Sequence, residues 1–347
     1  MSPNGLNQFL QSGAFIALPD GEMWLFYGAE EGANSSINTI CYTDFFGPSI
    51  SARKFSQKIR VSRQELVSLL TKNFKLEAFL PSWQAPSRAL FEQSFREIMG
   101  RILRGEIEKA VPVIRTQAEH RLSLSEKAFL LVSALSVKSQ SYPYGLWNEN
   151  SGILGVTPEI LFHRRGENLS TMALAGTCPK IEADRRPHLL KDQKEMAEHQ
   201  LVVKDICERL KKWGQAQVSG PQVLELSTLF HLKSEIHLQA HNFDDQELTL
   251  QLHPTAALGV YPRNYGLQWM KDLPYQKDRG IFGAPVLFPL AEDQSLCLVA
   301  IRNLMWDQGQ LLIHAGCGLV KDSQMPREWD ELMAKMNSVK STLGIPV

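Results

Sequence analysis

The 347-residue sequence lacks several features that would each point to a class of protein. It has no apolar run long enough to span a bilayer and no basic-then-apolar start segment of the secretory type. It has no excess of either charge, because 37 lysines and arginines balance 37 aspartates and glutamates. A surface that binds nucleic acid or an anionic membrane is therefore not expected. We expect a cytoplasmic protein that acts on a small molecule.

Cysteine is also scarce, and its spacing fits neither disulfide pairs nor a metal site. The five residues are scattered along the chain, which favours free thiols in a reducing compartment: Cys41, Cys178, Cys207, Cys297 and Cys317. Apolar residues make up 44% of the sequence, enough for a large core. The Pro-rich and Ser-rich stretch before Phe91 divides the chain into an N-terminal scaffold region, 1–90, and a second region, 91–347.

The segment 298–336 combines a hairpin, a glycine-rich corner and a helix. Its pattern predicts strands at Leu298–Met305 and Gln310–Ala315, and a helix that begins after Asp322-Ser323 and ends at Gly344. Gly316 and Gly318 leave backbone N–H groups open to an anion at the corner. Arg302, predicted on the neighbouring strand, adds a planar fork for a carboxylate.

Two pairs of glutamates lie one helical turn apart, Glu195 with Glu198 and Glu328 with Glu331. Lys335 follows on the same helix face as the second pair. Such a pair is commonly a solvated acidic turn favoured by the helix dipole. The alternative is a divalent metal between the two helices, since Mg²⁺ prefers carboxylate oxygens and keeps some of its waters.

Two ionisable residues lie in apolar surroundings, Lys109 in a predicted strand Ile107–Ile114 and Glu159 between Pro158 and an apolar run. Either residue, taken alone, fits the edge of a sheet. Buried, they would instead favour their neutral forms, an amine that accepts a proton and a carboxylic acid that donates one. His231, a lone histidine in an apolar run, is by itself more typical of a core residue.

Several motifs together resemble the chorismate-utilising enzymes, which include isochorismate, salicylate and anthranilate synthases. The similar segments are "VAIR", "HAGCGLVKDS", "EWDELMAKM", "GVTPEILF" with "ALAGT", "KDQKEMAEHQLVV", "TLFHL", "LHPTAALGV" and "DRGIFGAPVLF", from about Phe91 to the C-terminus. Pro112 departs from the aliphatic residue usual in the family. The resemblance implies an α+β fold, a large antiparallel sheet assembly with helices packed outside.

The resemblance also implies roles for single residues. Lys109 matches the lysine that activates water in isochorismate and salicylate synthases, where anthranilate-type enzymes carry glutamine, and Glu159 matches the proton donor. Glu195, Glu198, Glu328 and Glu331 match the residues facing Mg²⁺. The positions that match the substrate site are Ala175, Gly176, Thr177, His231, Phe282, Arg302, Gly316, Gly318 and Lys335.

We therefore expect an isochorismate synthase that uses Mg²⁺ and acts on chorismate as a monomer, without a glutamine amidotransferase subunit. A salicylate synthase, which adds pyruvate elimination, and a chorismate-binding protein without turnover remain alternatives.

Overall fold

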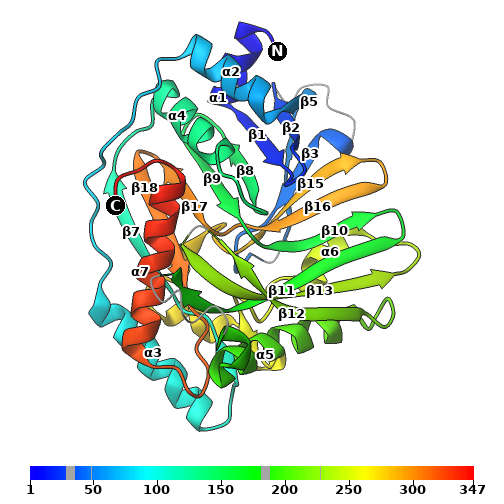
Figure 1. Cartoon of the computed structure of the whole chain (residues 1–347), viewed down its shortest axis with the longest axis vertical. Helices are drawn as coiled ribbons and strands as arrows, with labels where there is room; N and C mark the ends of the chain where they lie inside the picture. The colour runs from blue at the N-terminus through cyan, green and yellow to red at the C-terminus, as the bar shows by residue number, and fades with distance from the viewer. Residues whose placement is uncertain (29–35, 48, 181–187, 227) are drawn as a thin grey trace.

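The computed structural model describes residues 1–28, 36–47, 49–180, 188–226 and 228–347. Two eight-stranded antiparallel sheets dominate it (Figure 1). In spatial order, the first sheet contains β5 (Gln57–Ser62), β2 (Glu22–Tyr27), β1 (Gly13–Ala17), β8 (Tyr142–Trp147), β9 (Ser151–Thr157), β17 (Asn303–Asp307), β18 (Gln310–Gly316) and β7 (Val113–Glu119). The second contains β12 (Gln217–Glu225), β13 (Leu229–Gln239), β11 (Asn168–Pro179), β10 (Ile160–Arg165), β16 (Gln294–Val299), β15 (Pro285–Ala291), β3 (Thr39–Tyr42) and β4 (Ser51–Lys54). A separate ladder pairs β14 (Val260–Tyr261) with β6 (Lys109–Ala110).

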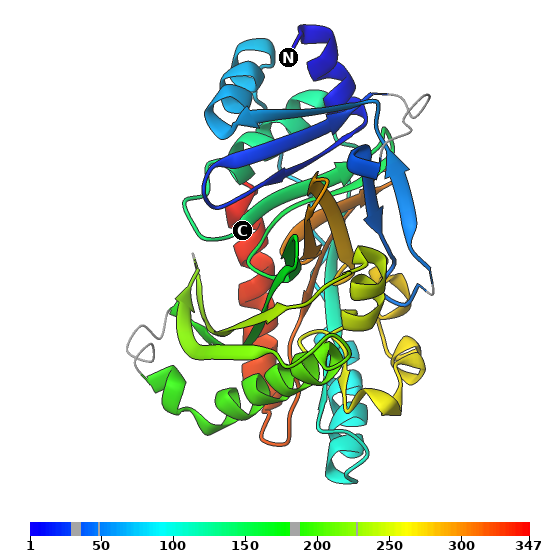
Figure 2. The same ribbon diagram turned by 90° about the vertical axis from the view of Figure 1, so that its right-hand side faces the viewer.

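Helices cover the outer faces of both sheets, as Figure 2 shows from the side. The first sheet packs against α1 (Pro3–Gln11), α2 (Arg63–Asn73), α3 (Arg88–Leu103), α4 (Leu124–Leu135) and α7 (Met325–Thr342). The second packs against α5 (Gln193–Leu210) and α6 (Asp245–Leu252). Short 3₁₀ turns complete the chain: η1 (Ser36–Asn38), η3 (Arg263–Tyr265), η4 (Gln268–Asp272) and η5 (Lys277–Arg279). The α+β class with outer helices is thus confirmed. Within the described ranges, no helix has the length and apolarity that a bilayer span requires.

The alternation of side chains along the strands explains the layers. In β1, Phe15 and Ala17 belong to the core under the helices, whereas Ala14 and Ile16 belong to the core between the two sheets. All of them are fully buried. Because neighbouring strand residues point to opposite faces, a strand that is apolar throughout is covered on both sides. The first 90 residues supply strands to both sheets, β1, β2 and β5 to one and β3 and β4 to the other.

Local signals in the sequence set several element ends correctly. The α2 helix begins at a capping box, in which Ser62 and Glu65 bond each other's backbone N–H groups. Gly21, with φ +96°, makes the turn of the β1–β2 hairpin. The α7 helix has Pro326 in its first turn and ends just before Gly344, with φ +70°. The predicted C-terminal helix is thus confirmed.

Two predicted strands are wrong in extent. Leu298–Met305 is not one strand, because β16 ends at Val299 in the second sheet and β17 begins at Asn303 in the first. Ile107–Ile114 is also interrupted, since the chain leaves the β6 ladder at Val111 and joins the first sheet as β7 only at Val113. Pro112 lies in this gap, where its missing N–H costs no ladder hydrogen bond.

Candidate active site

A two-stranded ribbon joins the two sheets and carries two of the expected site residues at its bends. The chain passes from β9 to β10 at Pro158-Glu159 and returns from β16 to β17 through residues 300–302. The two crossings are hydrogen-bonded, Val299 N to Glu159 O at 3.2 Å and Val156 N to Arg302 O at 3.1 Å. Arg302, expected on a strand, lies instead in the bend with φ +54°. This left-handed backbone is costly for a side-chain-bearing residue, and the paired crossing holds it in place.

Glu159 lies in a dry, cation-lined position at this bend. Its side chain is 4% exposed and lines a cavity of about 60 Å³, named here the inner cavity. Burial raises the pKa of Glu159 to about 7, although Lys109, Lys335 and Arg302 act in the opposite direction. Near neutral pH, therefore, a substantial fraction of this carboxyl group carries a proton that it can donate.

Lys109 is completely buried on the short β6 strand, paired across the ladder with Tyr261. Its Nζ lies 3.1 Å from Glu198 Oε1, in an ion pair whose alignment is not that of a hydrogen bond. Gly318 makes this approach possible, because a Cβ there would overlap Glu198 Oε1 and Lys109 Cε. Lys109 is therefore held behind Gly318 and Glu198, which themselves line the inner cavity.

A chain of polar contacts connects the second sheet to Arg302. Gly176, with φ +81°, forms a bulge in β11 that turns Thr177 toward His231 on β13. His231 Nδ1 lies 3.0 Å from Thr177 Oγ1, and its Nε2 lies 3.1 Å from Arg302 Nη2. Since a guanidinium only donates, His231 accepts at Nε2 and donates at Nδ1. Burial lowers the pKa of His231 well below its usual value and that of Arg302 to about 10.

The two pairs of glutamates converge from α5 and α7, and they are not solvated acidic turns. Glu198, Glu328 and Glu331 are 7%, 2% and 9% exposed. Lys194 lies among them, with Nζ 3.0 Å from Glu328 Oε1, 3.1 Å from Glu195 Oε1 and 3.6 Å from Glu198 Oε2. Glu195 Oε2 also accepts a hydrogen bond from the backbone N–H of Thr177 at 2.7 Å.

Electrostatics in this cluster favour an added cation. Burial, with the charges of neighbouring carboxylates, raises the pKa of Glu195 to about 8 and that of Glu328 to about 7. Oε2 of Glu328 has no hydrogen-bond partner among the described residues. No three His, Cys, Asp or Glu residues of the described ranges are arranged to hold a metal ion, and the ammonium of Lys194 lies between the carboxylates. The carboxylate oxygens of these glutamates are nevertheless the type of ligand that Mg²⁺ prefers.

The structure gathers ten of the fifteen expected site residues around the inner cavity: Glu159, Ala175, Thr177, Glu198, His231, Phe282, Arg302, Gly316, Gly318 and Lys335. Lys335 also bonds Gly316 O at 2.7 Å and pairs with Glu331 at 2.5 Å. Gly176 lies in the β11 bulge, behind the wall of the inner cavity. Glu195, Glu328 and Glu331 line a neighbouring cavity of about 410 Å³, named here the acidic cavity, which shares Thr177 with the inner one.

Sequence reasoning missed two residues of this site. His314 on β18 lines the inner cavity 2% exposed, stacks on Phe282 with ring centroids 5.2 Å apart, and has no hydrogen-bond partner for either ring nitrogen in the described ranges. Burial lowers its pKa to about 3. Lys194 is the other. A histidine within an apolar strand and a lysine beside a glutamate pair were the available signals.

Comparisons with known proteins match the chain to a family. A family model described as chorismate binding enzyme matches residues 29–344. The isochorismate synthase MenF of Escherichia coli K12 is 30% identical over 250 residues, which cover 70% of this chain and 57% of that protein. The vibriobactin-specific isochorismate synthase of Vibrio cholerae is 28% identical over 275 residues, 75% of this chain and 68% of that one. The solved structure of E. coli MenF superposes with a TM-score of 0.80 at 21% identity, over 97% of this chain and 91% of that chain.

Proposed function

Because the chain belongs to the chorismate-binding enzyme family, we propose that it converts chorismate to isochorismate. The observation that carries the proposal is the buried pair of a lysine at position 109 and a carboxylic acid at position 159 with a pKa near 7. The two curated relatives described above are named isochorismate synthases, which supports it. This chain spans only 57% of the E. coli protein, so its activity is inferred from its own site.

In the proposed reaction, Lys109 acts as the base and Glu159 as the acid. Lys109 would take a proton from a water molecule, whose oxygen attacks C2 of the ring. The ring double bonds shift, and Glu159 donates its proton to the 4-hydroxyl group, which departs as water. Glu198, 3.1 Å from Lys109, stabilises the positive charge that the amine gains. One group that accepts a proton and one that donates a proton can thus act in the same displacement of a hydroxyl group.

The substrate carboxylates would be held by separate parts of the inner cavity. Arg302 and the backbone amides of Gly316 and Gly318 would bind the enolpyruvyl carboxylate, since a guanidinium fork and exposed N–H groups suit a planar anion. The neutral His231 fixes the Arg302 guanidinium through its Nε2 contact. Phe282 presents a ring without a hydroxyl group to the substrate.

A magnesium ion would be held by Glu198 and Glu328, with Glu195 and Glu331 in support. Bound there, it would supply charge neutralisation for the ring carboxylate. Lys194 now provides a single positive charge at the same carboxylates. Entry of the ion therefore requires the Lys194 side chain to turn away from Glu328 and Glu195.

The direct test is to incubate the purified protein with chorismate and Mg²⁺ and to separate the products by chromatography. Isochorismate is the expected product, and salicylate with pyruvate would identify the alternative synthase. Chorismate that binds, as measured by equilibrium dialysis, but is recovered unchanged would show a binding protein without turnover. Ammonium added to a parallel reaction should give no anthranilate.

A further inference from the structure

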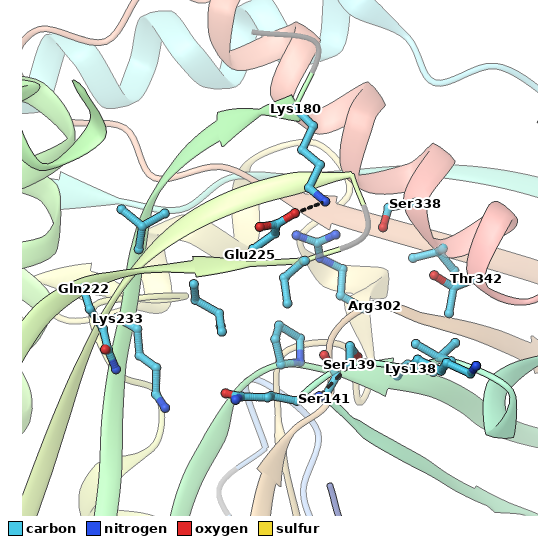
Figure 3. A pocket seen from close by; sticks show the side chains of 18 residues that line it. Lys138, Ser139, Ser141, Lys180, Gln222, Glu225, Lys233, Arg302, Ser338 and Thr342 are labelled. Carbon is cyan, nitrogen blue, oxygen red and sulfur yellow. Dashed lines mark hydrogen bonds and ion pairs between the residues drawn. The ribbon is translucent and has the colours of Figure 1, made fainter. Parts of the chain in front are cut away.

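A second, larger cavity meets the inner cavity at Arg302. This outer cavity has a volume of about 670 Å³ and shares Pro158 and Arg302 with the inner one. Its walls come from the loop that precedes β8, from β12 and from the last turns of α7, as Figure 3 shows. The inner cavity of about 60 Å³ therefore adjoins two larger cavities, the outer cavity at Pro158 and Arg302 and the acidic cavity at Thr177.

The outer cavity is basic. Its described lining contains four cationic side chains, Lys138, Lys180, Lys233 and Arg302, against one carboxylate, Glu225, a formal excess of three positive charges. Lys180 pairs with Glu225 at 2.7 Å above Arg302 (Figure 3), and Lys233 pairs with Glu235 at 2.8 Å. Lys138 is exposed and has no ion-pair partner among the described residues. This local excess contrasts with a chain whose formal net charge is zero.

Arg302 forms the floor of this opening and has no direct ion pair. Among the described residues, no carboxylate lies within 4.0 Å of its guanidinium, which contacts the neutral His231 and lies in the wider field of Glu159 and Glu331. A partly buried guanidinium without a directly paired anion is costly, and a carboxylate ligand reduces that cost. The lysines thus surround a path that ends at the Arg302 guanidinium, which can bind an anion.

The acidic cavity carries the opposite sign. Its described lining contains six carboxylates, Asp192, Glu195, Asp322, Glu328, Asp330 and Glu331, against three cations, Lys191, Lys194 and Arg327. The first half of α7 lines this cavity, whereas the second half lines the outer cavity. Without a bound metal ion, and with every carboxyl group counted as ionised, a dicarboxylate that approaches the acidic cavity meets a formal excess of three negative charges. Charged openings change association rates about 10-fold to 1,000-fold.

We infer that the outer cavity is the route by which a dicarboxylate substrate enters, drawn by its lysines toward Arg302. The inference rests on the proposed function for the identity of the dicarboxylate, chorismate. It assigns a task to Lys138 and Lys233, which belong to neither the acid–base pair nor the carboxylate cluster. No bond is made or broken in this step, and its signature is the rate of association rather than the affinity.

The test measures chorismate association with Mg²⁺ present, in a Glu159→Gln chain, in which turnover is expected to be too slow to interfere with rapid mixing. Rapid mixing is followed by tryptophan emission, with the dissociation constant checked by equilibrium dialysis. Lys138→Glu combined with Lys233→Gln should slow association about tenfold at low salt and less than twofold at 0.5 M salt, where screening is strong. The matched control Lys75→Glu, at an exposed position that lines neither cavity, should change the rate less than twofold.

Two further variants separate this route from the acidic one. Thr342→Trp places a large ring in the outer cavity and should slow association and dissociation together, which leaves the dissociation constant unchanged. Asp322→Lys with Asp330→Lys reverses charge at the acidic cavity and should leave association within twofold. The inference is overturned if this acidic pair speeds association while the Lys138 and Lys233 changes do nothing. Chorismate that binds by this route without forming isochorismate would refute the proposed function alone, and a complete lack of binding would refute both.

Discussion

Replacing Glu159 by glutamine should make the protein less active and, at alkaline pH, more stable. The side chain is 4% exposed, and its pKa is raised to about 7 chiefly by burial. Glutamine has almost the same shape as the protonated acid but cannot ionise or donate the proton. The same substitution therefore tests both the environment of residue 159 and its proposed role.

The size of the stability effect follows from the pKa. A rise from the ordinary value of 4.5 to about 7 corresponds to a free-energy difference of about 3 kcal/mol. The folded chain binds this proton more tightly than the unfolded chain, so the free energy of unfolding falls as pH rises from about 4.5 to about 7. Glu159→Gln should match the parent at pH 4.5 and exceed it by about 3 kcal/mol at pH 8.

Urea denaturation at both pH values measures this difference, and the parent curve is subtracted so that other titrating groups cancel. Glu119→Gln, at the exposed end of β7, is the matched control for removing one carboxyl group. In the same samples, isochorismate formation by Glu159→Gln should fall by about 10²-fold to 10⁴-fold, and the alkaline limb of its pH–rate profile should disappear.

Two results would refute this reasoning separately. An equal stability of parent and variant at pH 8 would mean that Glu159 ionises in the folded chain as easily as in water. Full activity with an unchanged bell-shaped profile would remove Glu159 from the mechanism, whatever its pKa.

The remaining predictions concern the base, the metal and the glycine between them. Lys109→Gln should lower isochorismate formation at least about 100-fold while chorismate still binds, and anthranilate formed from ammonium by the parent chain would contradict the role of this lysine. Glu198→Ala and Glu328→Ala should each abolish the Mg²⁺-dependent part of chorismate binding measured by calorimetry, and normal binding and turnover by either variant in EDTA would disprove the metal assignment. Gly318→Ala should abolish activity without unfolding, because its Cβ would overlap both Glu198 and Lys109; an active Gly318→Ala chain with unchanged circular dichroism would show that this close approach is unnecessary.

Local signals in the sequence predicted elements well, but not the path between the sheets. The capping box at Ser62 and the position of Pro326 act within one helical turn, so they can be recognised without the rest of the fold. The run from Leu298 to Met305 is apolar apart from Arg302 and Asn303, and nothing local marks the left-handed backbone of Arg302 at its bend. That conformation is imposed by the hydrogen bond from Val156 on a strand far away in the chain.

Chemistry within the site was predictable to a similar extent. The apolar neighbours of Glu159 allowed either a buried acid or a residue at the edge of a sheet, and the roles given to single residues rest on motif resemblance. The cation among the carboxylates, Lys194, could not be predicted, because it depends on how α5 and α7 approach each other. For the same reason, a histidine in a strand gives no sign that His314 faces a cavity with both nitrogens free of protein partners in the described ranges.

The ribbon that joins the two sheets couples the position of the site residues to both sheets. Glu159 and Arg302 each lie within three residues of both sheets along the chain, and they are tied to each other by the backbone bonds of Val299 and Val156. A core substitution that alters the spacing of the sheets therefore displaces the proton donor and the anion-binding group together rather than one relative to the other. Substitutions in the distant cores should therefore change the position of Glu159 relative to Arg302 only slightly. They should have a larger effect on the distance of both residues from Lys109, which lies on the separate β6–β14 ladder.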